Sequence, residues 1–411
     1  MTGPLRLVAR TRQVDAIVDV DLLAVAGGDG WLFTRGGAGF AGRGVARRVP
    51  RCELPATLAA ITADDALGCP GSGAMAFGAL PFLADSSAEL VVPEVVVSRD
   101  AEGKQWATTV LADGLDAEGR HHRLVEETVA RRHSPTTGPG SFEVRSTRPP
   151  SEWVAAVAGA IDRIRAGEVD KVVLAREVTV HADAPIPVAT VLARLAAAYP
   201  GCFLYLVDGF CGASPELLVS RAGDVVRAQP MAGTLPRSGD PDVDARRTAA
   251  LLASPTYRHE HQVTIDAVHD ALLAFSSYVD YQPEPSVVAL ANVSHLATSV
   301  EGRLSHPAAS VLELVEALHP TPAVCGRPSD AALALIAELE GLDRGRYAGV
   351  VGWVDATGNG EWAVAIRGAT VDGDTARLIA GNGIVADADP SLELTETRAK
   401  LQAMLSAIVR P

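Results

Sequence analysis

A run of strands and turns near the C-terminal end limits the possible folds more than any other feature of the sequence. Three strand-like stretches follow one another at residues 349–355, 361–371 and 376–385, separated by turn-forming residues at 357–360 and 372–374. Gaps this short indicate a meander of hairpins. Long helical stretches accompany it, so the pattern favours a layered α+β fold over a doubly wound parallel sheet.

The sequence before this meander has the same mixture of elements. Its patterns predict helices at 151–166, 188–198, most of 241–278, 308–318 and 329–341, and the chain closes with a helix at 390–408. Strand-like runs fall at 171–181, 203–207, 217–220, 224–228 and 287–300. We therefore divide the chain into residues 1–145, an N-terminal half of the fold, and a larger region at 150–411.

The N-terminal half has weaker signals. Short strand-like runs and a single helix are expected there, the strands at 30–33, 74–82, 89–98 and 106–111 and the helix at 54–67. Residues 131–150 are rich in Pro, Gly, Ser and Thr, which is typical of a loop. Residues 37–42 match the GxGxxG fingerprint of dinucleotide sites, but no amphipathic helix follows them. A glycine-rich hairpin explains these glycines better than a nucleotide site.

Charge and cysteine content exclude several classes of protein. The formal net charge of −14 argues against binding nucleic acid or anionic lipid through a general electrostatic field. No run approaches 18 apolar residues, and no export signal is apparent, so neither a membrane span nor secretion is expected. Five cysteines without a CxxC pair favour neither a disulfide framework nor a zinc site. The expected location is the cytoplasm.

Lysine is rare in this chain. Only Lys104, Lys171 and Lys400 are found among 36 basic residues, so arginine supplies almost every generic positive charge. Because lysine loses its proton more readily than arginine when it is desolvated, a retained lysine suggests a chemical role. Chance remains an alternative for each of the three.

The triplet His259-Glu260-His261 resembles part of a metal site. On a helix, residues two apart point about 200° away from each other, so the two histidines cannot bind one ion together. Glu260, between them, is the more informative residue.

Ten sequence blocks between residues 150 and 405 carry a recognisable pattern. They are VDKVVLAR (169–176), CGASPELLV (211–219), QPMAGTLPR (229–237), RHEHQVTIDAV (258–268), VSHLATSVEG (293–302), LHPTPAVCG (318–326), RYAGVVGWVD (346–355), WAVAIRG (362–368), AGNGIVADADP (380–390) and ELTETRAK (393–400). In this order they resemble the chorismate-utilising enzymes, and most closely the isochorismate synthases. The stretch AFGALPF (76–82) also resembles the N-terminal half of that family. The resemblance implies two facing antiparallel sheets surrounded by helices, a site between them, Mg²⁺ as cofactor and chorismate, a dicarboxylate, as substrate.

The resemblance also implies a metal site. Glu260 and Glu396 match the direct magnesium ligands of the family, and Glu393 matches a glutamate that holds a metal-bound water. Mg²⁺ suits two carboxylates because it takes oxygen ligands and completes its shell with water and substrate oxygens. Glu393 and Glu396 are three residues apart and therefore share a helix face. The alternative for such a pair is a solvated helix surface.

Further positions match residues that contact substrate in the family. Lys400, one turn beyond Glu396, matches a lysine that contacts a substrate carboxylate. For His295, near the ring and the metal in the family, a packed structural histidine is an equal alternative. The remaining matches are Arg367 and Tyr347 at the enolpyruvyl carboxylate, Gly383 beside it, Gly233 and Thr234 near the ring carboxylate, and Ala323 and Ile366 along the substrate.

Two residues match the acid and the base of the family. Water attacks ring carbon 2 with help from a base, and the hydroxyl at carbon 4 leaves with a proton from an acid. Lys171 matches the base and has to be neutral when it acts. Glu216 matches the acid and has to keep its proton near pH 7, for which its apolar neighbours in the sequence provide a reason.

Three positions distinguish among the enzymes of this family. A lysine at 171 favours water over ammonia as the attacking group. Ala232 stands where aminodeoxychorismate synthases carry a nucleophilic lysine, and Ala323 where salicylate synthases commonly carry threonine. The sequence therefore predicts a monomeric isochorismate synthase without an obligatory amidotransferase subunit. Salicylate synthase and a non-catalytic chorismate-binding relative remain alternatives, and a siderophore, menaquinone or salicylate pathway could use the product.

Overall fold

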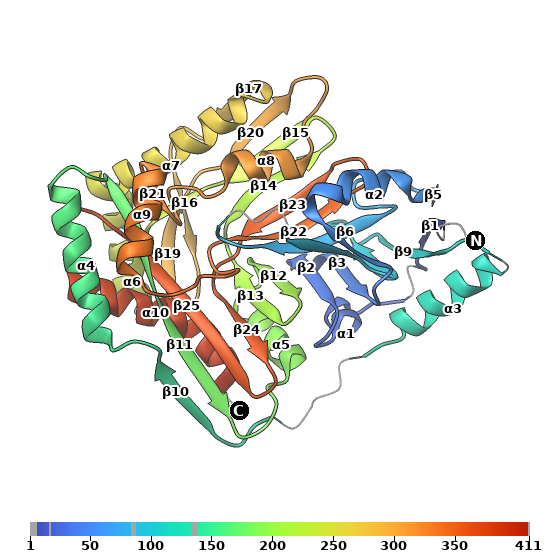
Figure 1. Ribbon diagram of the computed structural model, residues 1–411, viewed down its shortest axis with the longest axis horizontal. Coiled ribbons are helices and arrows are strands. Elements are labelled where there is room, and N and C mark those ends of the chain that lie inside the picture. Colours follow the sequence, from blue (N-terminus) through green and yellow to red (C-terminus); the bar gives the residue numbers. More distant parts are fainter. Residues whose placement is uncertain (1–5, 16–17, 84–87, 115, 133–137, 410–411) are drawn as a thin grey trace.

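Large sheets with helices around them form the protein, shown in Figure 1 as a computed structural model that describes residues 6–15, 18–83, 88–114, 116–132 and 138–409. The largest sheet has 13 strands. Its short strand β21 (Gly326–Arg327) pairs with β11, and the other strands run in the order β10 (Phe142–Ser146), β11 (Lys171–Ala182), β25 (Thr375–Ile384), β24 (Gly368–Asp372), β13 (Phe210–Ser214), β12 (Phe203–Val207), β2 (Trp31–Arg35), β3 (Ala38–Arg43), β8 (Val95–Arg99), β9 (Gln105–Ala112), β1 (Leu7–Gln13) and β5 (Thr62–Asp65).

A nine-stranded sheet and a three-stranded sheet complete the strands of the described residues. The nine-stranded sheet has the order β17 (Ser276–Tyr281), β20 (Val300–Leu304), β15 (Val225–Gln229), β14 (Leu217–Ala222), β23 (Gly360–Val364), β22 (Val350–Asp355), β6 (Met75–Leu80), β7 (Glu89–Val92) and β4 (Arg47–Pro50). The small sheet has the order β16 (Met231–Pro236), β19 (Val293–Ala297) and β18 (Ser286–Ala289). All pairings are antiparallel except β1 with β5.

An aromatic core joins the two large sheets. Phe33 of β2 stacks on Phe203 of β12, with ring centroids 5.3 Å apart. Phe40 of β3 meets Trp353 of β22 across the sheets at 4.5 Å, and Phe77 of β6 is fully buried in the same cluster. Strands from residues 1–145 thus share sheets and core with strands of the later region, since β2 pairs with β12 and β6 with β22.

Helices cover the outer faces of the sheets (Figure 1). The helices α10 and α4 pack together beside β25 and β11, while α7 and α8 pack on the strands β17 and β14. None of the described helices is long and apolar enough to cross a membrane. The ten described α-helices are α1 (Leu22–Ala26), α2 (Leu54–Ala60), α3 (Ala117–Val129), α4 (Pro150–Arg165), α5 (Val188–Ala198), α6 (Pro241–Ala253), α7 (Pro255–Leu273), α8 (Val311–Leu318), α9 (Ser329–Leu339) and α10 (Pro390–Val409).

The predicted α+β fold with two facing antiparallel sheets and surrounding helices is confirmed. The glycine-rich run at 37–42 lies in the β2–β3 hairpin, as expected. Several elements of the N-terminal half were predicted wrongly. The helix at 54–67 ends at Ala60, because residues 62–65 form β5 beside β1. The helices α1 and α3 were missed, and the supposed loop at 131–150 contains β10, an edge strand paired with β11.

The predicted strand at 361–371 was also wrong, and its error matters most for the site. The segment is two strands, since β23 belongs to the nine-stranded sheet and β24 to the 13-stranded sheet. Residues 365–367 carry the chain from one sheet to the other. Arg367 makes this crossing with a positive φ of 57°. Few non-glycine residues adopt such a φ, and they often lie at functional sites.

A buried ion pair ties the helix α9 to the 13-stranded sheet. Arg344 donates to Glu340 at 2.6 and 2.7 Å and to the backbone oxygens of Val324 and Val173, while Glu340 also accepts from the amide of Ala175. The two side chains are 3% and 1% exposed. Neither charge can therefore turn to water if its partner is removed.

We expect Arg344→Met to lower the free energy of unfolding by about 3–5 kcal/mol, because it leaves the Glu340 carboxylate buried without its cation. Urea denaturation followed by circular dichroism measures this loss. The double variant Glu340→Met with Arg344→Met is expected to recover most of it. A double variant as unstable as the single one would contradict this explanation.

Candidate active site

One cavity of about 690 Å³ contains every residue that the sequence analysis assigned to the site. Its size suits a small-molecule ligand. The walls come from the 13-stranded and three-stranded sheets, from α7 and α10, and from the crossing between β23 and β24. The assigned residues that line it are Lys171, Glu216, Gly233, Thr234, Glu260, His295, Ala323, Tyr347, Ile366, Arg367, Gly383, Glu393, Glu396 and Lys400.

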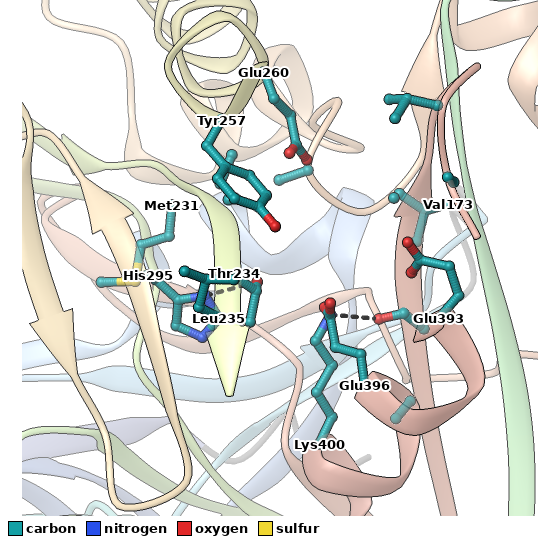
Figure 2. Close-up of a pocket in the computed structure, with 18 of the residues that line it drawn as sticks. Val173, Met231, Thr234, Leu235, Tyr257, Glu260, His295, Glu393, Glu396 and Lys400 are labelled. Atoms are coloured by element: carbon teal, nitrogen blue, oxygen red, sulfur yellow. Dashed lines mark hydrogen bonds and ion pairs between the residues drawn. The ribbon is translucent and has the colours of Figure 1, made fainter. Parts of the chain in front are cut away.

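The first three turns of α10 present three of these residues to the cavity (Figure 2). The helix begins at Pro390, where the Asp389 carboxylate accepts from the amides of residues 391 and 392. From there, residues 393, 396 and 400 share one face because they are three and four positions apart. The Lys400 ammonium donates to Glu396 at 2.8 Å and to the Gly381 oxygen and the Asn382 side chain on β25.

The opposite wall brings Glu260 of α7 to Lys171 of β11. The Lys171 ammonium lies 2.6 Å from a Glu260 carboxylate oxygen, and the lysine side chain is only 8% exposed. Gly383, on the neighbouring strand β25, makes room for this pair. A Cβ at residue 383 would lie 2.4 Å from Cε of Lys171. The sequence block GNGIV therefore has glycine at 383 because a side chain there would displace the lysine.

The three glutamates suit a hard cation by the chemistry of their donors. Burial is the main reason that the pKa of Glu393 rises to about 7, followed by repulsion from Glu396, with Glu260 adding a smaller effect. A cation among these carboxylates would relieve that repulsion. Within the part of the chain that the structure describes, no three His, Cys, Asp or Glu side chains are close enough to hold one ion as they stand. The magnesium assignment therefore stays a prediction.

Arg367 is oriented toward the cavity with unused donors. It is 9% exposed, and one of its terminal nitrogens donates to Nε2 of His295 at 3.1 Å. Its Nε and other terminal nitrogen are buried without a partner among the described residues. Buried guanidinium donors without a partner are costly, and a bidentate carboxylate would satisfy both. The local geometry thus favours an anionic ligand beside Arg367.

His295 is a neutral imidazole held in one orientation. Burial first, and then the positive charges of Arg367 and Lys400, lower its pKa well below the usual value. Because Arg367 can only donate, Nε2 of His295 must accept, and Nδ1 carries the proton. Thr234 is 3.0 Å from that Nδ1 and therefore accepts. His295 thus holds Arg367 and the turn at Gly233–Thr234 in place, which agrees with the alternative of a packed histidine.

Glu216 is a buried carboxyl whose pKa lies near neutral pH. It is 4% exposed, and burial raises its pKa to about 7, against smaller opposing effects of the Met231 amide and of the charges of Lys171 and Arg367. The Met231 amide is 3.4 Å from its carboxylate. The sequence analysis expected a raised pKa for Glu216 from its apolar neighbours, and the pKa is raised.

The other predicted positions shape the apolar part of the wall. Tyr347 is buried, and burial raises the pKa of its hydroxyl to about 12, so it remains a neutral donor. Ala323 and Ile366 add small apolar surfaces.

Sequence reasoning missed polar residues in and beside the wall, among them Asn382, Tyr257 and Arg247. Asn382 donates to the Glu393 carboxylate at 2.7 Å, and both Tyr257 and Arg247 line the cavity. Asn382 lies within one of the blocks quoted above. Tyr257 precedes Glu260 by three positions, which on a helix places both on one face. That spacing was available in the sequence and could have identified Tyr257.

Comparison with known proteins gives the site a context. Residues 52–409 match the family described as "Chorismate binding enzyme". The isochorismate synthase DhbC of Bacillus subtilis is 37% identical over 342 residues, which cover 80% of either chain. The isochorismate synthase EntC of Escherichia coli is 37% identical over 289 residues, 69% of this chain and 74% of EntC.

A solved structure agrees with the fold. MenF, the menaquinone-specific isochorismate synthase of Escherichia coli, superposes with a TM-score of 0.84 over 98% of this chain and 94% of MenF, at 24% identity. At that identity the likeness concerns the fold alone. Together with the match over residues 52–409, these findings show that the chain belongs to the chorismate binding enzyme family.

Proposed function

We propose that this protein is an isochorismate synthase, which adds water to ring carbon 2 of chorismate and releases the hydroxyl at carbon 4. The observation that carries the proposal is one cavity that combines a protonated carboxyl, a lysine amine and an arginine with free donors. An acid, a base and an anion-binding group are what this reaction needs. The names of the relatives agree with this assignment.

Substrate binding is assigned to the cations and donors of the wall. The free donors of Arg367 suit the enolpyruvyl carboxylate, and Tyr347 adds a neutral hydroxyl beside it. The turn at Gly233 and Thr234 and the Lys400 ammonium would hold the ring carboxylate. A chain of net charge −14 needs such placed groups to bind a dianion.

The proton transfers are assigned to Glu216 and Lys171. The Lys171 amine takes a proton from the attacking water while the new C2–O bond forms. The double bonds shift along the ring, the C4–O bond breaks, and Glu216 gives its proton to the departing hydroxyl. Glu216 is supported as the acid because burial keeps it protonated near pH 7. Lys171 is paired with Glu260 as an ammonium in this structure, so the proposal requires it to lose that proton before it acts as the base.

Glu260 and Glu396 would hold Mg²⁺ directly, and Glu393 would do so through water. When bound, Mg²⁺ supplies positive charge opposite a substrate carboxylate and neutralises the glutamates. The remainder of the proposal follows the sequence analysis: a cytoplasmic monomer that acts on chorismate without an amidotransferase subunit, with residues 150–411 as its catalytic region.

The direct test is to incubate the protein with chorismate, with and without Mg²⁺, and to separate the products by chromatography. We expect isochorismate with Mg²⁺ and none after chelation. Lys171→Ala is expected to form isochorismate about 10²–10⁴ times more slowly, as when a general base is removed. Lys104→Ala, an exposed lysine far from the site in the sequence, is the matched control and should keep the wild-type rate. A wild-type rate in Lys171→Ala would refute the base assignment.

The pH dependence should report the proton on Glu216. Because the acid must be protonated and its pKa is about 7, kcat/KM should fall as the pH rises through about 7. In Glu216→Gln, the residual activity should be lower by about 10²–10⁴ and should lack this decline. A variant that retains the same decline would assign it to another group.

Ala323 should limit pyruvate release. Because salicylate synthases commonly carry threonine here, Ala323→Thr is expected to release some pyruvate, measured by coupling to lactate dehydrogenase. Ala323→Val has the same shape without the hydroxyl and should release none. An unchanged product mixture in Ala323→Thr would show that this position does not separate the two activities.

A further inference from the structure

Tyr257 stands at the point where α7 meets the small sheet. It lies in the first turn of α7, where the Ser254 hydroxyl caps the helix by accepting from its amide. Its ring packs against the turn at Gly233, since a Cβ on that glycine would lie 3.3 Å from Cβ and 3.5 Å from Cδ1 of the tyrosine. Gly233 has a positive φ of 73°, a backbone conformation that glycine adopts without strain.

The hydroxyl of Tyr257 points into the cavity, toward the space that Glu260, Glu393 and Glu396 surround (Figure 2). Burial is the first reason that the pKa of this phenol rises above its usual value, and the charges of Glu396, Glu260 and Glu393 follow. The group is therefore a neutral donor at physiological pH. Among the described residues, none accepts a hydrogen bond from it.

A neutral donor is useful at this place because the glutamates repel an anion until a cation offsets their charge. The ring carboxylate of chorismate would have to approach three carboxylates on its way to the turn at Gly233 and Thr234. A hydroxyl fixed against that turn offers a hydrogen bond to an incoming oxygen without removing charge from the glutamates. Arg367 and Tyr347 belong to the other end of the substrate in the proposed function, so they do not supply this contact.

We propose that Tyr257 is a further substrate-binding residue whose hydroxyl donates a hydrogen bond to the ring carboxylate of chorismate, an inference that rests on the proposed function. The contact is made with the bound substrate and persists in the transition state, because the ring carboxylate does not react. Its loss should therefore weaken binding without slowing the chemical step.

Tyr257→Phe tests this, because it keeps the ring against Gly233 and removes only the hydroxyl. We expect KM for chorismate, and the dissociation constant of chorismate measured by calorimetry, to rise by about 5- to 30-fold, while kcat stays the same. The dissociation constant of Mg²⁺ alone and the melting temperature should not change. If the hydroxyl had a structural role, its loss would lower the melting temperature. If it had a metal-binding role, its loss would raise the dissociation constant of Mg²⁺. Tyr278→Phe, on the exposed edge strand β17, is the control.

The outcomes separate this inference from the proposed function. If the wild-type protein forms isochorismate and Tyr257→Phe keeps the wild-type KM, the inference is wrong and the function stands. If no isochorismate forms but Tyr257→Phe still binds chorismate more weakly, the function is wrong and the contact stands. A wild-type protein that binds no chorismate would overturn both.

Discussion

The site depends on how buried charges are balanced inside one cavity. Glu260 faces the Lys171 ammonium at 2.6 Å, and Glu396 faces Lys400 at 2.8 Å, so each of these carboxylates has a cation beside it. Within the part of the chain that the structure describes, no cation pairs with Glu216, and burial raises its pKa to about 7. The same physical penalty, the desolvation of charge, also raises the pKa of Glu393 to about 7, so the cavity combines two carboxylates paired with cations and two carboxyl groups whose pKa is raised by burial.

A single crossing between the two large sheets positions Arg367 at the site. The chain leaves the nine-stranded sheet after β23 and enters the 13-stranded sheet at β24. The aromatic core holds the sheets together, and Arg367 makes the crossing with a positive φ. Its guanidinium then meets His295 of the small sheet, so one side chain links all three sheets at the cavity. The strands β23 and β24 on either side of the crossing hold the backbone of Arg367 in this conformation.

A few cations stand among carboxylates in the cavity of this acidic protein. The chain carries a net charge of −14, yet its cavity contains Lys171, Arg367 and Lys400. In the proposed function, an anionic substrate is bound by a few placed donors, to which neutral groups add. Tyr257 and Tyr347 provide hydroxyls that burial keeps protonated, and such donors attract an anion without weakening the pairing of the glutamates.

The sequence by itself determined what depends on local spacing. Glu393, Glu396 and Lys400 share one face of α10 because helix geometry fixes that relation, and the ordered blocks identified the family. Only the tertiary structure decided which distant groups meet: Arg367 with His295, Lys171 with Glu260, and Tyr257 with Gly233. It also decided the division of residues 361–371 between two sheets, which an apolar run cannot reveal because pairing partners are distant in sequence. The tertiary structure also decided the raised pKa of Glu216, since burial is a property of the whole fold.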